Sequence, residues 1–163
     1  MSATNRIKRY LTCRNVPFEL IAHPKRDTSV ATAEVEHVPC EKMLKAVMAR
    51  VEGRHAMIVV PADRVVDLFK VSTALGTSNI SIEEEADFDC VFPDCERGAM
   101  PPMGMLYDIP CYLDRAVGNT AEVYFNAGSH GETIRMSLHD FVDLSDTVIG
   151  DYSVPRKKYG CES

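Results

Sequence analysis

A lysine set between apolar residues is the first feature of this sequence that could do chemistry. Lys45 lies in the run Met-Leu-Lys-Ala-Val-Met, with apolar neighbours on both sides. An ammonium group in such surroundings can hold a phosphate or stabilise negative charge that develops during a reaction. The alternative is a lysine whose apolar stem packs along an amphipathic segment while its charge reaches water. The residues alone leave both interpretations open.

A glycine-proline loop could supply backbone donors for the same chemistry. In the run Gly98-Ala99-Met100-Pro101-Pro102, the first three residues offer N–H groups. The two prolines stiffen the turn and present no donors of their own. Such a loop can cradle an oxygen anion or a ribose, although a rigid surface crossover has the same composition.

A polar corner follows a predicted strand later in the chain. Asn126 supplies an amide, Gly128 supplies backbone freedom, and His130 supplies an imidazole that can bind a substrate amine or carbonyl. A polar hairpin turn is the open alternative. The remaining histidines are expected at surface or capping positions: His23, His37, His55 and His139.

Common metal and cofactor motifs are missing. His37-x2-Cys40 and Cys90-x4-Cys95 are not matched by a second pair at zinc-finger spacing. The glycine-rich nucleotide and dinucleotide signatures, the serine-hydrolase elbow and the zinc-protease motif are also absent from the sequence. We therefore expect no metal and no cofactor, and no signature singles out one cysteine as a nucleophile.

Length and composition indicate one compact domain spanning residues 1–163. Hydrophobic residues make up 45% of the chain and charged residues 26%, as in ordinary globular proteins. No apolar run reaches the roughly 20 residues of a membrane span, and the N-terminus lacks a secretory segment. We expect a cytoplasmic protein with no membrane partner, whose six cysteines stay reduced without a disulfide framework.

Charge is distributed unevenly along the chain. The net charge of −6 argues against a uniformly basic nucleic-acid binder, and we expect no DNA partner. Residues 1–26 nevertheless carry six Lys or Arg against one Glu, whereas residues 83–96 are strongly acidic. A local basic patch can hold phosphates while the acidic stretch stays clear of them. Two solvated surfaces are the open alternative.

Hydrophobic periodicity predicts mixed helices and strands. Helices are expected around 7–16, at 28–36 after a Thr28 or Ser29 cap, at 64–75 after an Asp63 cap, and from Ser137 onward. Strands are expected at 18–22, 55–60, 80–82, 111–113, 122–126 and 133–136. Residues 41–51, which contain Lys45, fit either a helix or a strand.

Three further segments depend on local signals. Gly76 is placed to end the 64–75 helix, and Ser81 with Glu84 fits a capping box for a short acidic helix. Residues 92–110 hold four prolines and two glycines, which predicts a long shaped loop. The tail from Asp146 is expected to be loosely held.

The order of several segments resembles the YbaK-like family. The segments are HPKRDTSVATAEVEHVP, MLKAVM, VVPADRVVDL, FPDCERGAMPPMG, YDIPCYLD and YFNAGSH, between about His23 and Leu144. That family includes bacterial editing proteins and the insertion domain of bacterial prolyl-tRNA synthetases, which hydrolyse wrongly charged aminoacyl-tRNA. The resemblance implies a mixed α/β domain built on a curved, partly barrel-like sheet with flanking helices. It also favours a strand at Lys45.

The resemblance implies roles for particular residues. Lys45 matches the family lysine, Gly98 and Pro102 match the ends of its G-x-x-x-P loop, and Gly128 matches a late glycine. His130 is a weaker match. Family members closer to the bacterial reference proteins often carry a serine where this chain has Asn126.

The implied activity is trans-editing: hydrolysis of the ester at the 3′ end of a mischarged tRNA that carries a small amino acid. In this reading the catalytic residues are Lys45 and the loop residues Gly98, Ala99 and Met100. The substrate-binding residues are Pro101, Pro102, Asn126, Gly128 and His130. A non-catalytic module that binds a tRNA end or an amino acid is the alternative. The edited amino acid, the tRNA, the attacking oxygen and the oligomeric state stay open.

Overall fold

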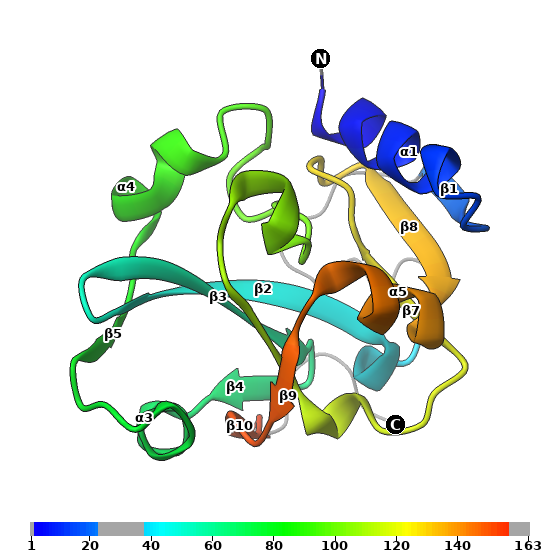
Figure 1. Cartoon of the computed structure of the whole chain (residues 1–163). Helices are drawn as coiled ribbons and strands as arrows, with labels where there is room; N and C mark the ends of the chain where they lie inside the picture. Colours follow the sequence, from blue (N-terminus) through cyan, green and yellow to red (C-terminus); the bar gives the residue numbers. More distant parts are fainter. Residues whose placement is uncertain (1, 23–37, 157–163) are drawn as a thin grey trace.

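A mixed β-sheet forms the centre of the molecule (Figure 1). The structure is a computed structural model that describes residues 2–22 and 38–156. Eight strands make one sheet in the order β1-β8-β7-β2-β3-β6-β9, with β5 paired to β2 outside this path. Their bounds are β1 Glu19–Ala22, β2 Met43–Val51, β3 Arg54–Pro61, β5 Ile80–Ile82, β6 Cys111–Asp114, β7 Glu122–Asn126, β8 Glu132–Ser137 and β9 Val148–Gly150.

A second, small sheet pairs two distant segments. Strand β4 (Arg64–Val66) runs antiparallel to β10 (Ser153–Pro155). In the main sheet β2 is antiparallel to β3 and β5 but parallel to β7, and β3 is parallel to β6. The sheet is therefore mixed, as expected for the mixed α+β class.

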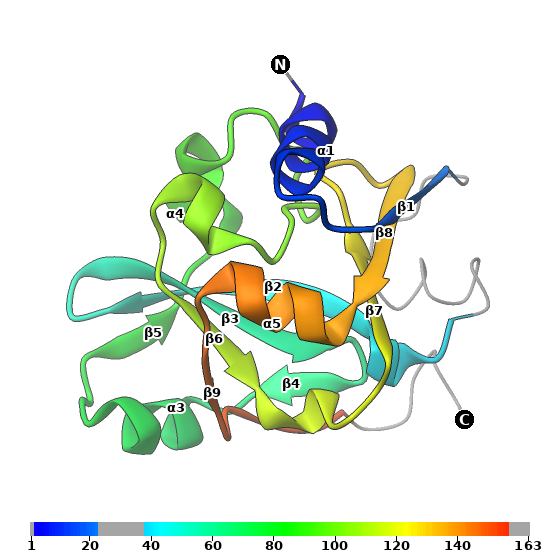
Figure 2. The same cartoon turned by 45° about the vertical axis from the view of Figure 1, so that its right-hand side comes forward.

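Four α-helices surround the sheet in the described part of the chain: α1 (Ala3–Cys13), α3 (Leu68–Leu75), α4 (Glu85–Phe88) and α5 (Leu138–Ser145). Helix α5 packs against β7 and β8 and lies across one face of the sheet in Figure 2. Short 3-10 turns complete the chain: η1 Cys40–Lys42, η2 Asp89–Val91, η3 Gly104–Tyr107 and η4 Arg115–Val117.

Strand β2 separates two apolar clusters, which explains why its segment is extended. Leu44 and Met48 pack into the larger cluster with α1, α5 and the 92–110 loop. Ala49 and Val47 belong to the cluster on the opposite face, together with the buried Tyr152. A segment that buries alternate residues on two faces suits the period of two of a strand, so burial decides the helix-or-strand ambiguity at 41–51.

Most predicted elements are confirmed. The strands at 18–22, 55–60, 80–82, 111–113, 122–126 and 133–136 and the last helix are present, with shifts of one or two residues. The first helix is also present, but it begins and ends three to four residues earlier than expected. Ser137 caps α5 by accepting a hydrogen bond from the N–H of Asp140 at 3.0 Å, and Gly76 ends α3 with φ +69°. The predicted helix at 28–36 lies outside the described residues.

The predicted cap at Asp63 is wrong. Arg64–Val66 is strand β4, and α3 starts only at Leu68. Asp67 is the cap, since its carboxylate accepts hydrogen bonds from the N–H groups of Phe69 and Lys70 at 2.9 and 3.2 Å. β-branched Val65 and Val66 favour a strand, and the pairing with β10 supplies the partner that the local pattern could not reveal.

The predicted capping box is also displaced. It joins Glu84 and Asp87 rather than Ser81 and Glu84, because Ser81 is still within β5. The Glu84 N–H donates to Asp87 Oδ2 at 3.0 Å.

The loosely held tail is contradicted for residues 146–156. This segment forms β9 and β10, and Tyr152 between them is 1% exposed. The Tyr152 N–H donates to Asp114 Oδ2 at 2.9 Å, and its hydroxyl donates to the Val148 carbonyl at 3.0 Å. An aromatic residue buried by distant strands therefore fixes this segment, which local composition could not show.

The expectation that all cysteines are reduced is contradicted at Cys40, which is disulfide-bonded. Cys13, Cys90, Cys95 and Cys111 are free thiols.

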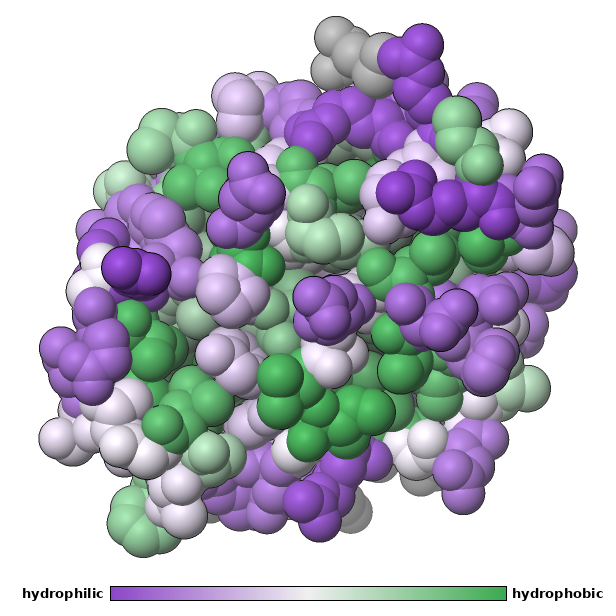
Figure 3. Space-filling view, viewed as in Figure 1, coloured by the Kyte–Doolittle hydropathy of each residue, from purple (hydrophilic) through white to green (hydrophobic). Residues whose placement is uncertain are grey.

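Figure 3 shows the surface of the molecule from the same side as Figure 1, where apolar side chains are scattered among polar ones. Among residues 2–22 and 38–156, no helix is long and apolar enough to cross a membrane.

Candidate functional site

A pocket of about 470 Å³ opens along the middle of β2. Strand β7 pairs with β2 at Met43 and Leu44, and β5 pairs with it at 49–51. Within the part of the chain that the structure describes, residues 45–48 have no strand on this edge. The pocket occupies this interruption of the sheet. Its lining is Lys45, Ala46, Val47, Met48, Val65, Glu83, Glu85, Phe88, Gly98, Met100 and Arg156.

Lys45 lies half-buried in the wall of this pocket, in line with the sequence expectation of a partly buried cation. Burial lowers the pKa of its ammonium below the usual value, because the charged form loses solvation. The positive charge of Arg156 lowers this pKa further, whereas the attraction of Asp63 opposes the change. The cation is thus held in a confined, weakly solvated position beside a second cation.

Asp63 and Arg156 are neighbours of Lys45 that sequence reasoning missed as site residues. The Arg156 N–H donates to the Asp63 carbonyl at 2.8 Å, which ties the end of β10 to the β3–β4 turn. Asp63 Oδ1 is buried and has no hydrogen-bond partner among the residues that the structure describes. Asp63 stands in the segment VVPADRVVDL, so the resemblance contained a signal for it. Arg156 carried no signal, because its segment was expected to be loosely held.

Asn126 is the last residue of β7 and follows Phe125, whose pairing with Leu44 is the last between β7 and β2. The alternation of the two strands puts its side chain on the same face as that of Lys45, but Asn126 is not among the residues that line the pocket. Asn126 is 4% exposed, and its Oδ1 is buried with no hydrogen-bond partner within residues 2–22 and 38–156. A buried amide oxygen without a donor is costly unless something occupies it, which makes it a candidate acceptor for a substrate hydrogen.

The glycine-proline loop contributes two of its predicted residues to the pocket. Gly98, with φ +77°, and Met100 line it. Ala99 is buried, and its N–H already donates to the Glu96 carbonyl at 3.1 Å, so this expected donor is in use. Pro101 and Pro102 are buried and are not among the lining residues. Their role as substrate contacts stays a prediction.

Gly128 connects the 126–131 corner to the loop that carries Gly98. Its N–H donates to the Ala99 carbonyl at 2.9 Å, and its carbonyl accepts from the Glu96 N–H at 2.8 Å. With φ +96°, a side chain here would be strained, and an added Cβ would lie 2.3 Å from the Cβ of Ala3 on α1. A glycine is therefore required for the loops and α1 to approach this closely.

His130 also connects these loops. Its N–H donates to Glu96 Oε1 at 2.7 Å, and its ring Nε2 pairs with the Arg97 carbonyl. Its Nδ1 is buried without a partner in the described structure. The side chain thus holds Arg97, next to Gly98, in place, whereas contact between His130 and a substrate stays a prediction.

The far end of the pocket is acidic. The Glu83 side chain is 1% exposed, and its two oxygens pair with His55 Nδ1 at 2.7 Å and Arg50 Nη2 at 3.1 Å. Glu85 lies on the same wall. The acidic stretch therefore borders the pocket instead of lying apart from it. Because Arg50 and His55 occupy Glu83, the carboxylate available at this anionic end is that of Glu85, which forms no ion pair among the described residues.

Thiols and metal ligands are not arranged for chemistry in this pocket. Burial raises the pKa of Cys95 to about 12, although a hydrogen bond with Tyr107 opposes the shift. Burial likewise raises the pKa of Cys111 to about 11. Both thiols are protonated at neutral pH and are weak nucleophiles. In the described ranges, no group of three or more His, Cys, Asp or Glu side chains is placed to hold a metal ion.

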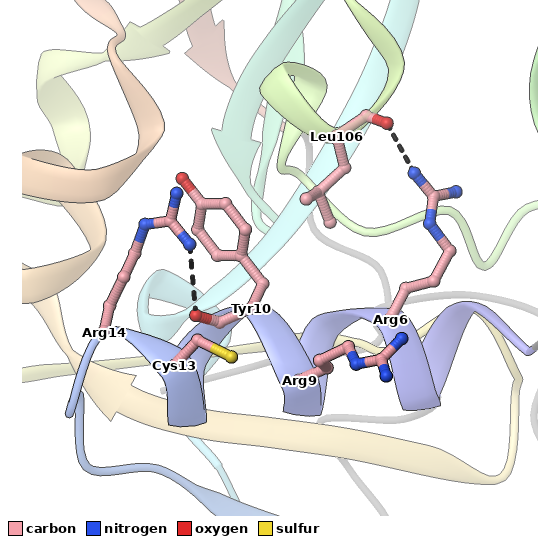
Figure 4. A pocket seen from close by; sticks show the side chains of 6 residues that line it. All are labelled: Arg6, Arg9, Tyr10, Cys13, Arg14 and Leu106. Carbon is pink, nitrogen blue, oxygen red and sulfur yellow. Dashed lines mark hydrogen bonds between the residues drawn. The ribbon is translucent and has the colours of Figure 1, made fainter.

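A second pocket, of about 450 Å³, lies on α1 (Figure 4). Its lining is Arg6, Arg9, Tyr10, Cys13, Arg14 and Leu106. It contains much of the N-terminal basic cluster.

Comparisons with known proteins relate the chain to tRNA editing. The chain is 22% identical over 140 residues to the multifunctional Ser/Thr-tRNA deacylase ProXp-y of Escherichia coli (strain K12), with 83% of each chain covered. It is 22% identical over 116 residues to the proline–tRNA ligase of Geobacillus thermodenitrificans (strain NG80-2), covering 71% of this chain. The chain spans about a fifth of the length of the proline–tRNA ligases from Geobacillus and from Bacillus mycoides (strain KBAB4).

A solved structure shares the fold. The crystal structure of a candidate trans-editing enzyme for prolyl-tRNA synthetase superposes with a TM-score of 0.82 at 17% identity, covering 94% of this chain and 98% of that one. The aminoacyl-tRNA editing domain family matches residues 23–144, which include Lys45, the Gly98 loop and the 126–131 corner. The chain therefore belongs to the aminoacyl-tRNA editing domain family.

Proposed function

We propose that this protein is a trans-editing deacylase that hydrolyses the ester of a mischarged tRNA carrying a small amino acid. The observation that carries the proposal is the half-buried Lys45 in a pocket shared with Gly98 and Met100, inside the editing domain. The partner is the 3′ end of an aminoacyl-tRNA in the cytoplasm, without DNA or a membrane. The editing unit is a single domain.

The mechanism rests on positioning, because an aminoacyl ester is already activated. A water attacks the ester carbonyl carbon and gives up a proton, which the departing ribose oxygen later takes up, and the oxygen of that carbonyl becomes an oxyanion. Attack by the neighbouring ribose hydroxyl would only move the aminoacyl group to that hydroxyl and would leave the tRNA charged. Lys45 and the N–H groups of Gly98 and Met100 stabilise this charge. Collapse of the intermediate breaks the bond to the ribose oxygen, which leaves as the hydroxyl after taking a proton. Asn126 Oδ1 accepts a substrate hydrogen during positioning.

Side-chain selection follows from the apolar part of the wall. Met48, Phe88 and Met100 limit the space beside Lys45. Such a pocket excludes larger side chains by steric clash more sharply than it rejects smaller ones. The name of the E. coli relative, a Ser/Thr-tRNA deacylase, supports a small aminoacyl group.

The test is single-turnover deacylation of tRNAs charged with alanine, serine, threonine or phenylalanine. We expect release of one or more of the small amino acids and slow release of phenylalanine. A matched titration with uncharged and charged tRNA separates catalysis from binding. If the protein binds every charged tRNA and hydrolyses none, it is a non-catalytic binding module and not an enzyme. Faster release of phenylalanine than of the small amino acids would overturn the small-pocket proposal.

A further inference from the structure

The cationic end of the pocket includes a residue from beyond the family-matched region. The editing domain match ends at residue 144, whereas Arg156 follows β10. Arg156 lines the same pocket as Lys45. The second cation of the site therefore comes from a segment outside the family-matched region.

The segment that carries Arg156 is firmly attached. Strand β10 pairs with β4 over three residues, and Arg64 donates from Nε to Ser153 Oγ at 2.7 Å. The Lys70 ammonium donates to the Ser153 carbonyl at 3.0 Å, and the Asp67 N–H donates to the Tyr152 carbonyl at 2.9 Å. The backbone of Arg156 is thus held beside the pocket by the fold, while its side chain is exposed at the rim.

Lys45 and Arg156 are two cations with a single carboxylate, that of Asp63, in their neighbourhood. Among the described residues, neither side chain makes an ion pair, and Asp63 acts on Lys45 only through longer-range attraction. Two like charges beside one pocket repel each other, and a bound anion removes this repulsion. The arrangement suits an anionic ligand with at least one strong acceptor for a guanidinium.

The opposite end of the pocket fixes the direction of such a ligand. The Glu83 N–H donates to the Met48 carbonyl at 3.0 Å, so the acidic end lies three residues along β2 from Lys45. At roughly 3.3 Å per strand residue, the two ends are about 10 Å apart. An aminoacyl-nucleotide has the same polarity, with an ammonium at one end and a phosphate at the other. Its phosphate belongs at the Lys45–Arg156 end.

We propose that Arg156 binds the 5′-phosphate of the terminal nucleotide, which leaves Lys45 for the ester oxygens. Strand β10 thereby adds to the editing site a contact that distinguishes a nucleotide ester from a simple aminoacyl ester. The inference rests on the proposed function, because it takes the aminoacyl-tRNA end as the occupant of the pocket.

The test measures binding without catalysis. The probes are 3′-alanylamido-3′-deoxyadenosine, whose amide resists hydrolysis, and the same compound with a 5′-phosphate. In calorimetry, wild type should prefer the phosphorylated probe. Arg156→Ala should weaken the binding of the phosphorylated probe by about 10-fold to 100-fold, the range expected for loss of a charge-assisted hydrogen bond. The affinity for the unphosphorylated probe should not change. Arg156→Lys should keep part of the preference for the phosphorylated probe, because lysine keeps the positive charge but lacks the paired N–H donors of a guanidinium.

The control is Arg54→Ala, which removes an exposed arginine at the start of β3 and should change neither affinity. Thermal melts check that the variants fold. Equal affinities of wild type for the two probes, or equal weakening of both by Arg156→Ala, would overturn the phosphate contact. Because the probes are not hydrolysed, this outcome is independent of whether the protein deacylates tRNA, which the mischarged-tRNA screen decides.

Discussion

The two cationic pockets are similar in volume, at about 450 and 470 Å³, but their cations have different partners. On α1, Arg6 donates to Asp94 at 2.8 Å and to the Leu106 carbonyl at 2.6 Å. Arg14 stacks over the Tyr10 ring at 3.6 Å (Figure 4). Lys45 in the other pocket has no such partner within the described residues. A count of cations therefore does not locate a binding site.

The difference also concerns what each region holds together. The Arg6 guanidinium lies 4.6 Å from the Tyr107 ring centre, and the Tyr107 hydroxyl donates to Asp94 at 3.0 Å. Arg6 thus fastens α1 to the loop that also carries Gly98. Arg6 in the α1 pocket therefore stabilises the packing of α1 on the protein, whereas Lys45 in the β2 pocket is available to a ligand.

The largest expected effect is that of Lys45→Ala. If the Lys45 ammonium stabilises the oxyanion, single-turnover deacylation should slow by about 100-fold to 1000-fold, as on removal of one preorganised donor. The fold should persist, because losing a desolvated charge removes a burial cost. Arg54→Ala, which removes an exposed arginine outside both pockets, is the control and should keep the hydrolytic rate. A fully active, folded Lys45→Ala protein would refute the assigned role.

The pH dependence of the rate should distinguish Lys45 from an ordinary surface lysine. Burial and Arg156 lower the pKa of Lys45, so its ammonium is lost at lower pH than usual. The catalysed rate should be full below this lowered pKa and fall as pH rises through it, after subtraction of alkaline hydrolysis. Lys45→Arg should move the fall to higher pH, because a guanidinium keeps its proton. An identical falling limb in both proteins would assign it to another group.

Arg6→Ala should affect stability more than chemistry. Loss of the bonds to Asp94 and Leu106 should lower the free energy of unfolding by about 1 to 2 kcal/mol, given the partial exposure of the pair. Urea melts measure the change, with Arg9→Ala in the same pocket as control. An unchanged midpoint for Arg6→Ala would show that α1 is held by its apolar face alone.

The smallest expected effect is on the exposed side of α1. If Lys8 and Arg9 contact tRNA phosphates, reversing both to Glu should weaken tRNA binding. The slope of log affinity against log salt should flatten by about 0.7 to 0.9 for each lost contact. Cleavage of the terminal aminoacyl-adenosine should not change. An unchanged slope would leave this cluster as a solvated surface.

Local patterns predicted most of the main sheet correctly. Short β-branched runs and turn residues mark strands at 55–60, 122–126 and 133–136, and Ser137 is a recognisable N-cap for the last helix. These features depend on near neighbours, so they can be read without the fold. Asp63 and the tail depended on pairing between residues about 90 positions apart, such as Arg64 with Ser153. No local signal reports such a pairing.

The sequence by itself determined the family, the mixed class and the position of Lys45, because each rests on residue order and local composition. Only the tertiary structure decided which cations are free. Arg6 and Lys45 are both basic residues beside apolar ones in the sequence. Folding places Asp94 against Arg6 and an interruption of the sheet beside Lys45. Charge and burial act through space, so the partners of a cation are set by the elements that folding brings together.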